Sequence, residues 1–470
     1  MTRTTPDPQS LPVLLPNDHV NSRLTMKNRL IRRTSSAAVA VGALALAACG
    51  GGGGSSSAGG STDLSVPDKK EGTLSMVTKF ADPQYAPYFE KVVSDYEAAN
   101  PGVDIKLEQV GDQPYKDKIR VLSAANDLPD IYFSWAGDFA NKFIRAGLAA
   151  DLSSVIGPDT KVGSTLAPAA LDTFEYQGKN YGLPINLDGK YLAYSGAAFD
   201  KAGITKEPAT LEDLLASCDK LKAAGVQPIA FGNQFGWPAI HYITQLNAYN
   251  VPAATLAKDY DPQGGEFTDP GYTQALQQFS DIVTRCATPN ANGVSHETAQ
   301  ANFLAGKAAM QYIESVEFPA LTAKGGAPAS IANSWDFFRL PAPSGAKGDT
   351  KALTGAPDGF LVNAKSKNAG LAVDFLKFFS SRDEAAQMTK EIGWLSPVQG
   401  SATADNSFPQ LTRTLQDMSQ ASQFAIWLDT VAHANVASAY LAGVEGMIGG
   451  KLQPAQVMSS VKAAAAKVKK

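Results

Sequence analysis

The stretch TLSMVTKFADPQYAPYFEKVVSDYEAANPGVDIKLE, residues 73–108, contains the pattern that decides the fold class. It opens with a short apolar segment, residues 73–78, which predicts a strand. Aromatic and aliphatic side chains then recur at helical spacing after Asp82-Pro83, a pair that favours a helix start, and Asn100-Pro101-Gly102 predicts the helix end. Apolar and charged residues alternate over 103–108, as they do in a strand. The segment therefore predicts a strand, helix, strand unit.

The following residues predict a second unit of the same kind. A helix is expected around 116–124, a break at Leu128-Pro129-Asp130, a strand over 131–134, and a further helix that ends at Gly147. Because strands alternate with helices, the chain is expected to form an α/β fold with a parallel sheet and helices on both faces. Such sheets bind ligands beyond the carboxyl ends of their strands.

The first fifty residues have the pattern of an export signal. Basic residues between Lys27 and Arg33 precede an uncharged run, Ala37 to Ala48, which is shorter than the ~20 residues of a membrane helix. Leu46-Ala47-Ala48-Cys49 resembles the lipobox of bacterial lipoproteins, and this resemblance implies a lipid on Cys49; a plain secretory signal is the alternative. Residues 1–25 indicate a mis-assigned start or an extension. Residues 49–70, rich in Gly and Ser, predict a tether.

Composition and charge exclude several classes of protein. The chain has 470 residues, 44% of them hydrophobic and 18% charged, which is typical of a globular protein and excludes general disorder. The net charge is −4, and loss of residues 1–48 removes six basic and two acidic groups and leaves −8. No basic block follows the N-terminus, so we expect no nucleic-acid partner. Four histidines and three cysteines lead us to expect no metal or other cofactor.

Two cysteines lie on apolar stripes of predicted helices. Thr210 is a helix cap, and Cys218 follows it on the apolar side of that helix; Cys286 ends a second stripe that begins at Tyr272. An exported protein meets an oxidising compartment. We therefore predict a Cys218–Cys286 disulfide, with two buried free thiols as the alternative.

Several short motifs, in a fixed order, point to a family. In this order, behind the lipobox, they resemble the extracellular solute-binding proteins (family 1) of carbohydrate ABC importers, the group that includes maltose-binding protein. The resemblance covers nearly the whole mature chain. The motifs are Leu128-Pro129-Asp130-Ile131, Gly147-Leu148-Ala149-Ala150-Asp151-Leu152, Tyr181-Gly182-Leu183-Pro184, Phe199-Asp200-Lys201-Ala202-Gly203-Ile204, Phe303-Leu304-Ala305-Gly306-Lys307-Ala308-Ala309-Met310 and the stretch from Gly359 to Asn368.

The resemblance implies a type II periplasmic-binding-protein fold. In this fold two α/β lobes, each a mixed, mostly parallel sheet flanked by helices, close about a hinge on a ligand in the cleft between them. The implied first lobe comprises residues 71–184 and 355–394, and the second comprises 187–348 and 397–470. Hinge strands are expected near 184–186, 350–354 and 395–397, where Pro and Gly residues cluster.

A sugar site needs aromatic platforms for C–H faces and polar groups for hydroxyls. The resemblance implies that such residues lie on loops at the cleft, although the Trp of the family's Gly-x-Trp-Glu motif is replaced here by Val316. Each candidate also has a structural alternative: the tryptophans as core residues, Asp138 as the cap of a helix, and Lys79 and Glu317 as solvated surface charges. The implied ligand contacts are Lys79, Trp135, Asp138, Asp188, Trp237, Glu317, Asp358, Trp394, Trp427 and Asp429.

Three functions fit these features to different degrees. A lipid-anchored receptor would deliver a sugar or oligosaccharide to the permease of an ABC importer. A secreted glycoside-acting enzyme would need a pair of carboxylates across the scissile bond, and the sequence contains no nucleophile elbow, zinc-protease helix or phosphate loop. A receptor for a peptide, polyamine or iron is the third; polyamine sites favour dense acid, whereas here we expect tryptophans beside single carboxylates. We therefore predict a monomeric, non-enzymatic receptor for a neutral sugar, anchored outside the cytoplasm.

Overall fold

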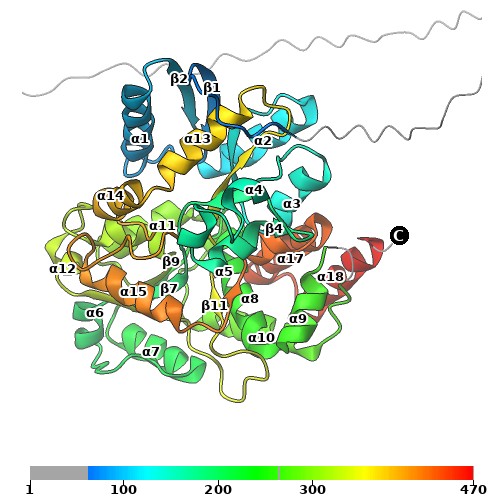
Figure 1. Cartoon of the computed structure of the whole chain (residues 1–470). Coiled ribbons are helices and arrows are strands. Elements are labelled where there is room, and N and C mark those ends of the chain that lie inside the picture. The colour runs from blue at the N-terminus through cyan, green and yellow to red at the C-terminus, as the bar shows by residue number, and fades with distance from the viewer. Residues whose placement is uncertain (1–61, 263–264, 469–470) are drawn as a thin grey trace, which may run out of the picture. The chain divides into compact units, whose positions relative to one another are not determined.

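The computed structural model describes residues 62–262 and 265–468, all of which belong to the second of the two units into which the chain divides (Figure 1). The predicted signal at 1–48, the lipid attachment at Cys49 and most of the tether lie outside the described residues. Within this unit the chain builds two separate sheets flanked by helices. In the described part of the chain, no helix combines the length and the apolar composition that crossing a membrane requires.

The first sheet contains the strands that the opening stretch predicts. Its spatial order is β2-β1-β3-β12-β6, and β1 pairs in parallel with both β2 and β3. β12 enters from much later in the chain and pairs antiparallel with β3 and β6. The strands are β1 (Gly72–Thr78), β2 (Val103–Gln109), β3 (Ile131–Trp135), β6 (Gly182–Pro184) and β12 (Asp358–Val362).

Helices α1 and α13 lie beside β1 and β2, as Figure 1 shows. The expected helix start at Asp82-Pro83 is wrong by about one turn, because Asp82 forms a turn of its own. Its backbone carbonyl accepts from the amides of Tyr85 and Ala86 at 2.9 and 2.8 Å, and its carboxylate accepts from the amide of Gln84. The main helices around this sheet are α1 (Ala86–Ala99), α2 (Asp112–Ala125), α3 (Asp138–Arg145), α13 (Ala369–Phe379) and α14 (Arg382–Ile392).

The second sheet has the order β10-β7-β9-β8. β7 pairs antiparallel with β10 and with β9, and β8 pairs in parallel with β9. The strands are β7 (Lys190–Ser195), β8 (Gln227–Ala230), β9 (Ala308–Glu314) and β10 (Trp335–Phe338).

The α/β class and the two-lobed fold are thus as predicted, but the expectation of mostly parallel sheets is wrong. Only two of the four pairings in the first sheet and one of the three in the second, among the described residues, are parallel. The physical reason is connectivity. A helical crossover within one sheet brings the next strand in parallel. In contrast, β7 follows β6 of the first sheet, and β12 follows β11, which pairs with β13 outside both main sheets, so no such crossover sets the direction of β7 or β12.

Helices cover the second sheet and extend to the end of the described chain. The longer ones are α7 (Leu211–Ala223), α8 (Trp237–Asn250), α10 (Pro270–Arg285), α11 (His296–Leu304), α15 (Pro409–Ser419), α17 (Ala434–Ile448) and α18 (Pro454–Val468). Short elements complete the fold: α4 (Ser153–Ile156), α5 (Pro168–Leu171), α6 (Gly196–Lys201), α9 (Ala253–Tyr260), α12 (Ala329–Ala332), α16 (Leu428–Val431), η1 (Gly163–Thr165), η2 (Asp172–Phe174), η3 (Ala291–Gly293), η4 (Ser315–Leu321), β4 (Glu175–Tyr176), β5 (Lys179–Asn180), β11 (Leu353–Thr354) and β13 (Phe424–Ala425).

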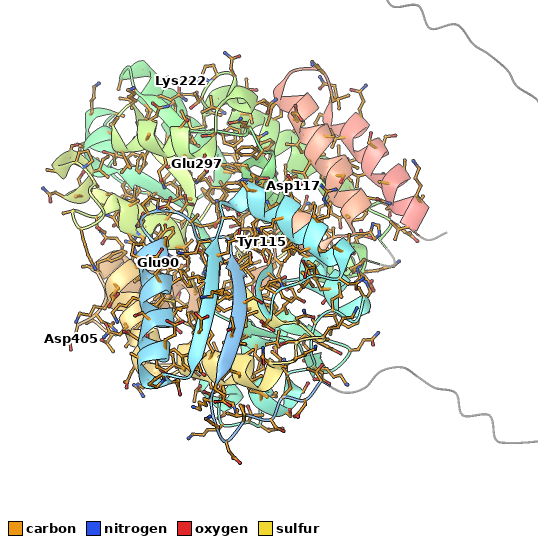
Figure 2. All side chains as sticks on the ribbon, turned by 90° about the horizontal axis from the view of Figure 1, so that it is seen from above. Glu90, Tyr115, Asp117, Lys222, Glu297 and Asp405 are labelled. Atoms are coloured by element: carbon orange, nitrogen blue, oxygen red, sulfur yellow. A yellow bond between two sulfur atoms is a disulfide. The ribbon has the colours of Figure 1, made fainter. Side chains whose placement is uncertain are left out.

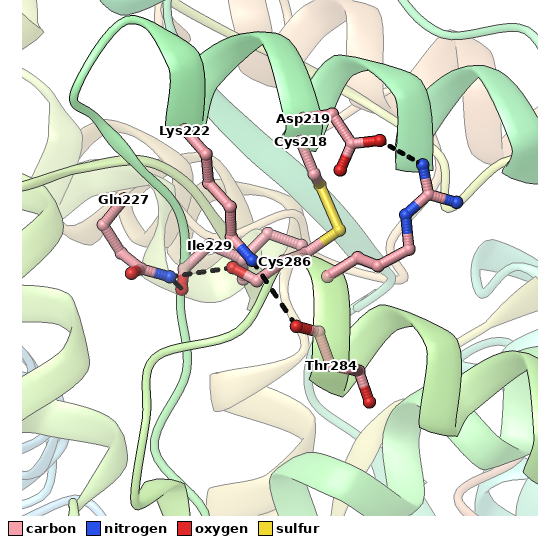
Figure 3. The surroundings of a disulfide bond; sticks show 8 residues. Cys218, Asp219, Lys222, Gln227, Ile229, Thr284 and Cys286 are labelled. Atoms are coloured by element: carbon pink, nitrogen blue, oxygen red, sulfur yellow. Dashed lines mark hydrogen bonds and ion pairs between the residues drawn. A yellow bond between two sulfur atoms is a disulfide. The ribbon is translucent and has the colours of Figure 1, made fainter.

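The predicted disulfide is present in this half of the molecule. Cys218 of α7 and Cys286, directly after α10, are both fully buried, and their Cα atoms are 5.3 Å apart (Figure 3). An ion pair between Asp219 and Arg285 at 2.5 Å and a hydrogen bond from Lys222 Nζ to the Thr284 carbonyl join the same two helices. The cross-link therefore lies in the core, and neither cysteine lines the two cavities at the strand ends.

The segments that connect the two sheets hydrogen-bond to one another. The amide of Ile185 donates to the carbonyl of Asp358 at 2.8 Å, and the amide of Leu187 donates to the carbonyl of Leu395 at 2.7 Å. Separate apolar cores lie against the two sheets, one built mainly from residues 74–185 and 356–398. The connecting segments hold the facing strand ends of the two sheets next to each other.

Candidate ligand-binding site

The facing strand ends surround two adjoining cavities, of about 160 and 390 Å³. Lys79 follows β1, Trp135 ends β3, and Glu314 ends β9, so the cavities lie at carboxyl ends of strands in both sheets, as predicted. We call the smaller one the tryptophan cavity. It is lined by Lys79, Asp112, Lys116, Trp135, Asp188, Trp237, His241, His296, Glu314, Glu317, Asp358, Trp427, Asp429 and Thr430.

Trp135 forms the first-sheet side of the tryptophan cavity. Its ring makes edge-to-face contacts with Phe133 and Phe139, both at 4.8 Å between centroids, and with Tyr115 at 5.9 Å. Tyr115 points from α2 toward β3, where its hydroxyl donates to the Phe133 carbonyl, while Asp117 of the same helix is exposed (Figure 2). These contacts fix the orientation of the indole before any ligand binds.

Two ammonium groups lie over the Trp135 ring. Lys79 Nζ and Lys116 Nζ are each 4.9 Å from its centroid, in the range of cation–π contacts. Lys79 is also 3.6 Å from carboxylate oxygens of both Asp112 and Asp358, and Lys116 is 3.3 Å from Asp112. These carboxylates raise the pKa of Lys79 even though burial opposes its charge. Lys79 is therefore a charged, paired group at the cavity wall.

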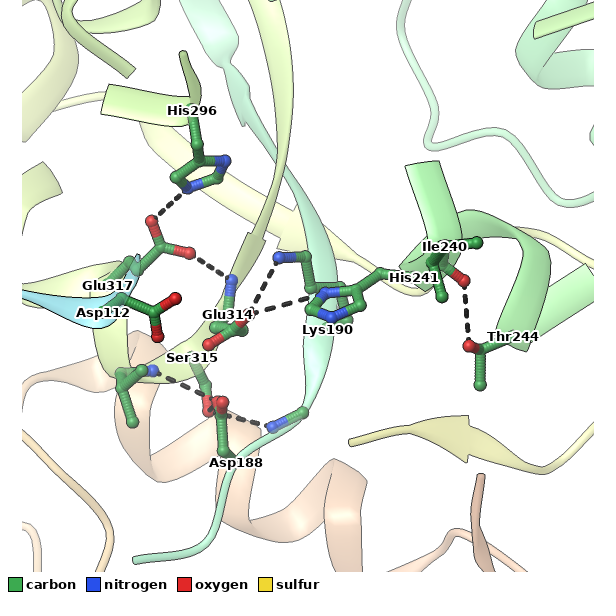
Figure 4. Close-up of polar contacts among 12 residues, drawn as sticks. Asp112, Asp188, Lys190, Ile240, His241, Thr244, His296, Glu314, Ser315 and Glu317 are labelled. Carbon is green, nitrogen blue, oxygen red and sulfur yellow. Dashed lines mark hydrogen bonds and ion pairs between the residues drawn. The ribbon is translucent and has the colours of Figure 1, made fainter. Parts of the chain in front are cut away.

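The second-sheet side is built on the pairing of β7 with β9. Lys190 and Glu314 are register partners, and Lys190 Nζ lies 3.2 Å from Glu314 Oε1 (Figure 4). The Lys190 side chain is fully buried and its ammonium lies 4.9 Å from the Trp237 ring. Burial acts to raise the pKa of Glu314, but Lys190 and Lys79 outweigh it and hold this pKa below the usual value. Glu314 is thus an ionised acceptor.

Imidazole and indole rings form a continuous array on this side. Trp237 lies 4.7 Å from the ring of His296 and 5.0 Å from that of His241, and His241 stacks on Trp427 at 4.1 Å with 21° between the planes. Burial, reinforced by Lys190, holds the pKa of His241 well below the usual value, so its imidazole is neutral. Trp237 is partly exposed, whereas Trp427 is 4% exposed.

Asp188 and Glu317 are held by the turn that follows β9. Asp188 Oδ1 accepts from Ser315 Oγ at 2.8 Å and from the Val316 amide at 3.3 Å (Figure 4). Glu317 Oε2 accepts from the Glu314 amide at 2.7 Å, and its Oε1 lies 2.5 Å from His296 Nε2. Burial, with Glu314 and Asp358 nearby, raises the pKa of Asp188 well above the usual range.

Asp358 and Asp429 are further carboxyl groups whose ionised forms are disfavoured. Burial raises the pKa of Asp358 to about 6, although Lys79 opposes this shift. Burial likewise raises the pKa of Asp429. One carboxylate oxygen of Asp429, Oδ1, is buried and has no hydrogen-bond partner among the described residues.

Trp394 lines the larger cavity and is 2% exposed. Its indole nitrogen donates to the Val316 carbonyl at 3.0 Å, and its ring packs against Phe80 and Tyr85 with centroids 5.1 and 4.8 Å away. Tyr85 donates to the same Val316 carbonyl at 3.0 Å. Trp394 therefore joins the first-sheet half to the turn after β9 as well as bordering the cavity.

Asp138 does not line either of these cavities. It is the first residue of α3, where Gly137 holds the cap position, and it makes no capping hydrogen bond, so the alternative prediction of a capping role is wrong. Its carboxylate pairs instead with Arg145 Nη1 at 2.5 Å. Asp138 lines a separate cavity of about 390 Å³ beside α9.

The structure adds residues that sequence reasoning missed. Lys190 was detectable in principle, because a charge at the start of an apolar strand requires a partner. The others have no local signal, since their roles come from contacts between distant elements. The expectation of tryptophans beside single carboxylates is wrong, because six carboxylates line the tryptophan cavity. The missed residues are Asp112, Lys116, Lys190, His241, His296 and Glu314.

The two-lobed α/β fold thus holds a polar, aromatic cavity between its two sheets. Residues 82–386 match the family of bacterial extracellular solute-binding proteins, and the chain belongs to this family. This membership confirms the predicted family. It also agrees with the prediction that the chain is not an enzyme, because the family is one of binding proteins.

Curated relatives and solved structures agree with this assignment. A putative binding protein of Brucella abortus (strain 2308) is 28% identical over 334 residues, which are 69% of this chain and 76% of the relative. A maltotriose-binding protein of Pyrococcus abyssi (strain GE5 / Orsay) is 25% identical over 322 residues, 65% of this chain and 62% of the relative.

Two solved structures share the fold at low sequence identity. A structure from a study of xylan utilization by the thermophilic bacterium Caldanaerobius polysaccharolyticus has a TM-score of 0.77 and 23% identity, and covers 83% of this chain and 99% of its own. A chitin oligosaccharide binding protein has a TM-score of 0.77 and 22% identity, and the match covers 85% of this chain and 99% of that protein's chain. These likenesses confirm the two-lobed fold.

Proposed function

We propose that this chain is the substrate-binding protein of an ABC importer, that it captures a sugar or oligosaccharide in the tryptophan cavity, and that it delivers the sugar to the importer's permease. The observation that carries the proposal is the convergence of Trp135, Trp237 and Trp427 with several carboxylates at strand ends of both sheets. The printed functions of relatives support it, since one is a maltotriose-binding protein and one solved structure is a chitin oligosaccharide binding protein.

The chemistry of the cavity suits a polyhydroxylated ligand. The partly exposed face of Trp237 offers an apolar platform for a C–H face. Asp429 Oδ1, which lacks a protein partner in the described chain, and Glu314 accept hydrogen bonds from hydroxyls, while Lys79 donates them. The larger adjoining cavity shares Lys79, Glu314 and Asp358 with the tryptophan cavity, and gives room for a second sugar unit.

Capture would couple binding to closure of two lobes. We place the first lobe at 71–184 and 355–394 and the second at 187–348 and 397–470, because the two sheets are built from strands in these ranges. The hydrogen bonds of Tyr85 and Trp394 to the Val316 carbonyl would belong to the closed form. The ligand favours closure by its differential affinity for the two forms.

Delivery would take place at the outer face of the membrane. We propose that a lipid on Cys49 anchors the protein there and that residues 49–70 act as the tether. The permease and its ATPase are separate proteins in this proposal, and the binding protein acts as a monomer without a cofactor.

Calorimetric titration with a panel of mono- and oligosaccharides tests the proposal. We expect saturable binding of at least one sugar, a higher melting midpoint in its presence, and unchanged sugar after prolonged incubation. Titrations with polyamines and short peptides are the matched controls. Binding of a control class with no binding of any sugar would overturn the sugar assignment, and release of hydrolysed sugar would overturn the non-enzymatic function.

A further inference from the structure

Resting on the function proposed above, we propose that the sugar held in the tryptophan cavity carries a protonated amino group, so that the ligand is an amino sugar. This goes against the neutral solute that sequence composition favours. The inference starts from the groups that line the cavity, where carboxyl groups outnumber ammonium groups. Six carboxylates meet there, Asp112, Asp188, Glu314, Glu317, Asp358 and Asp429, whereas the ammonium groups at the same walls are those of Lys79, Lys116 and Lys190.

The three lysines are already paired with other carboxylates. Lys79 lies between Asp112 and Asp358, and Lys116 also pairs with Asp112. Lys190 pairs with Glu314 at 3.2 Å. In the described part of the chain no ammonium or guanidinium group lies within ion-pair distance of Asp188 or Asp429. Glu317 has His296 as its partner, with His296 Nε2 2.5 Å from Glu317 Oε1. Asp188 and Asp429 are therefore the carboxyl groups left without a cationic partner. Burial raises the pKa of both, and a ligand cation beside them would favour their ionised forms.

Asp429 has a carboxylate oxygen to which no hydrogen-bond donor is paired in the described chain. Its Oδ1 is buried against the cavity wall and accepts no hydrogen bond from any described residue. A buried polar atom without a partner is costly, and such atoms are rare in folded proteins. A sugar hydroxyl would supply one neutral donor there. A protonated amine supplies three donors together with the opposite charge, and charge-assisted hydrogen bonds are about twice as strong as neutral ones.

The rings around Asp429 also favour a cation. Trp427, two residues before it, and Trp237 line the same cavity, and Trp237 is partly exposed. Indole faces attract ammonium groups. The protein already places its own ammonium groups 4.9 Å from the centroids of Trp135 and Trp237, so this cavity is built for contacts of that kind. His241, which separates Trp427 from Trp237, is neutral and adds no repulsion.

Calorimetry with matched sugars tests the inference. Glucosamine, galactosamine and mannosamine would each be compared with the parent sugar and the N-acetylated sugar, at about pH 6.5, where amines of this basicity are protonated. N-acetylation keeps the nitrogen and removes its charge. We expect at least one amino sugar to bind about tenfold more tightly than both its parent and its N-acetyl form.

Two variants assign the preference to residues. Asp429→Asn should weaken binding of the amino sugar about tenfold more than binding of the parent sugar, and Asp188→Asn provides a second variant should the first fail to fold. Asp172→Asn, at an exposed position outside the cavity, is the matched control and should keep the preference. Equal binding of amino and parent sugars, or retention of the preference in both cavity variants, overturns this inference and leaves the proposed function intact. Absence of binding by every sugar overturns the proposed function itself.

Discussion

The two sheets bring different tryptophans to one cavity. Trp135, from the first sheet, is 7% exposed, packs edge-to-face against three aromatic rings and has two ammonium groups over its own ring. Trp237, which begins α8 beyond the second sheet, is partly exposed and contacts two imidazoles and one ammonium group. The same residue type therefore has two different environments a short distance apart.

The two environments predict different roles, with Trp135 contributing mainly to stability and Trp237 mainly to ligand binding. Trp135 has little free surface to offer a ligand, and its main contribution is to the packing of the wall and the placement of Lys79 and Lys116. Trp237 keeps part of its ring accessible, so its apolar surface is buried when a ligand enters. Substitutions in the two halves should then change different measured quantities.

Trp135→Ala should have the largest effect, on stability. Truncating a buried tryptophan removes its packing and leaves a cavity, so we expect the free energy of unfolding to fall by about 3 to 5 kcal/mol. Urea denaturation followed by circular dichroism measures it. Trp135→Phe is the control and should lose much less. A loss below about 1 kcal/mol for Trp135→Ala would show that the contrast between the two tryptophans is wrong.

Trp237→Ala should mainly affect binding. Loss of a partly exposed platform should weaken affinity for the tightest-binding sugar of the panel by about 2 to 4 kcal/mol, with a smaller change in stability. Calorimetry provides the dissociation constant. Phe235→Ala is the matched control, because Phe235 is 45% exposed, lies two residues earlier and does not line the tryptophan cavity. Equal losses in both variants would remove Trp237 from the site.

Asp358→Asn tests the electrostatics of the first-sheet wall. The pKa of Asp358 is raised from 3.8 to about 6, so its stabilising contribution is present when it is protonated, below 3.8, and is lost as pH rises through about 6. An asparagine stays neutral throughout. The free energy of unfolding of the variant, relative to that of wild type, should therefore rise by about 2 to 3 kcal/mol between about pH 4 and about pH 7. Parallel urea denaturation at the two pH values measures this, and a pH-independent difference would contradict the raised pKa.

Asp138→Asn should have the smallest effect. Asp138 pairs with Arg145 and lies outside both cavities at the strand ends, so we expect sugar affinity to change by less than about 0.5 kcal/mol. The same calorimetric titration measures it, with Asp429→Asn as the contrasting variant. A tenfold loss of affinity in Asp138→Asn would return this residue to the ligand set that the family resemblance implies.

The sequence correctly predicted the elements that depend on patterns among neighbouring residues. The capped helix at Thr210, the strands that become β1 and β3, and the burial of Cys218 and Cys286 all follow from periodicity within about fifteen residues, and the structure contains each of them. The start of α1 was missed because Asp82 uses its hydrogen-bonding groups in a turn that competes with the helix. The pairing directions of β7 and β12 were missed because the chain enters each of these strands from outside the sheet to which the strand belongs.

The sequence by itself determined the α/β class and the buried positions of Cys218 and Cys286, because hydrophobic periodicity and capping are properties of neighbouring residues. Only the tertiary structure decided which charges meet in the site. Lys190 and Glu314 are 124 residues apart in sequence. Lys79 follows β1, the first strand of the first sheet in sequence, and Asp358 begins β12, the last. Whether a carboxylate is paired, protonated or left for a ligand depends on burial and on charges within a few ångströms, and the folded chain sets those distances.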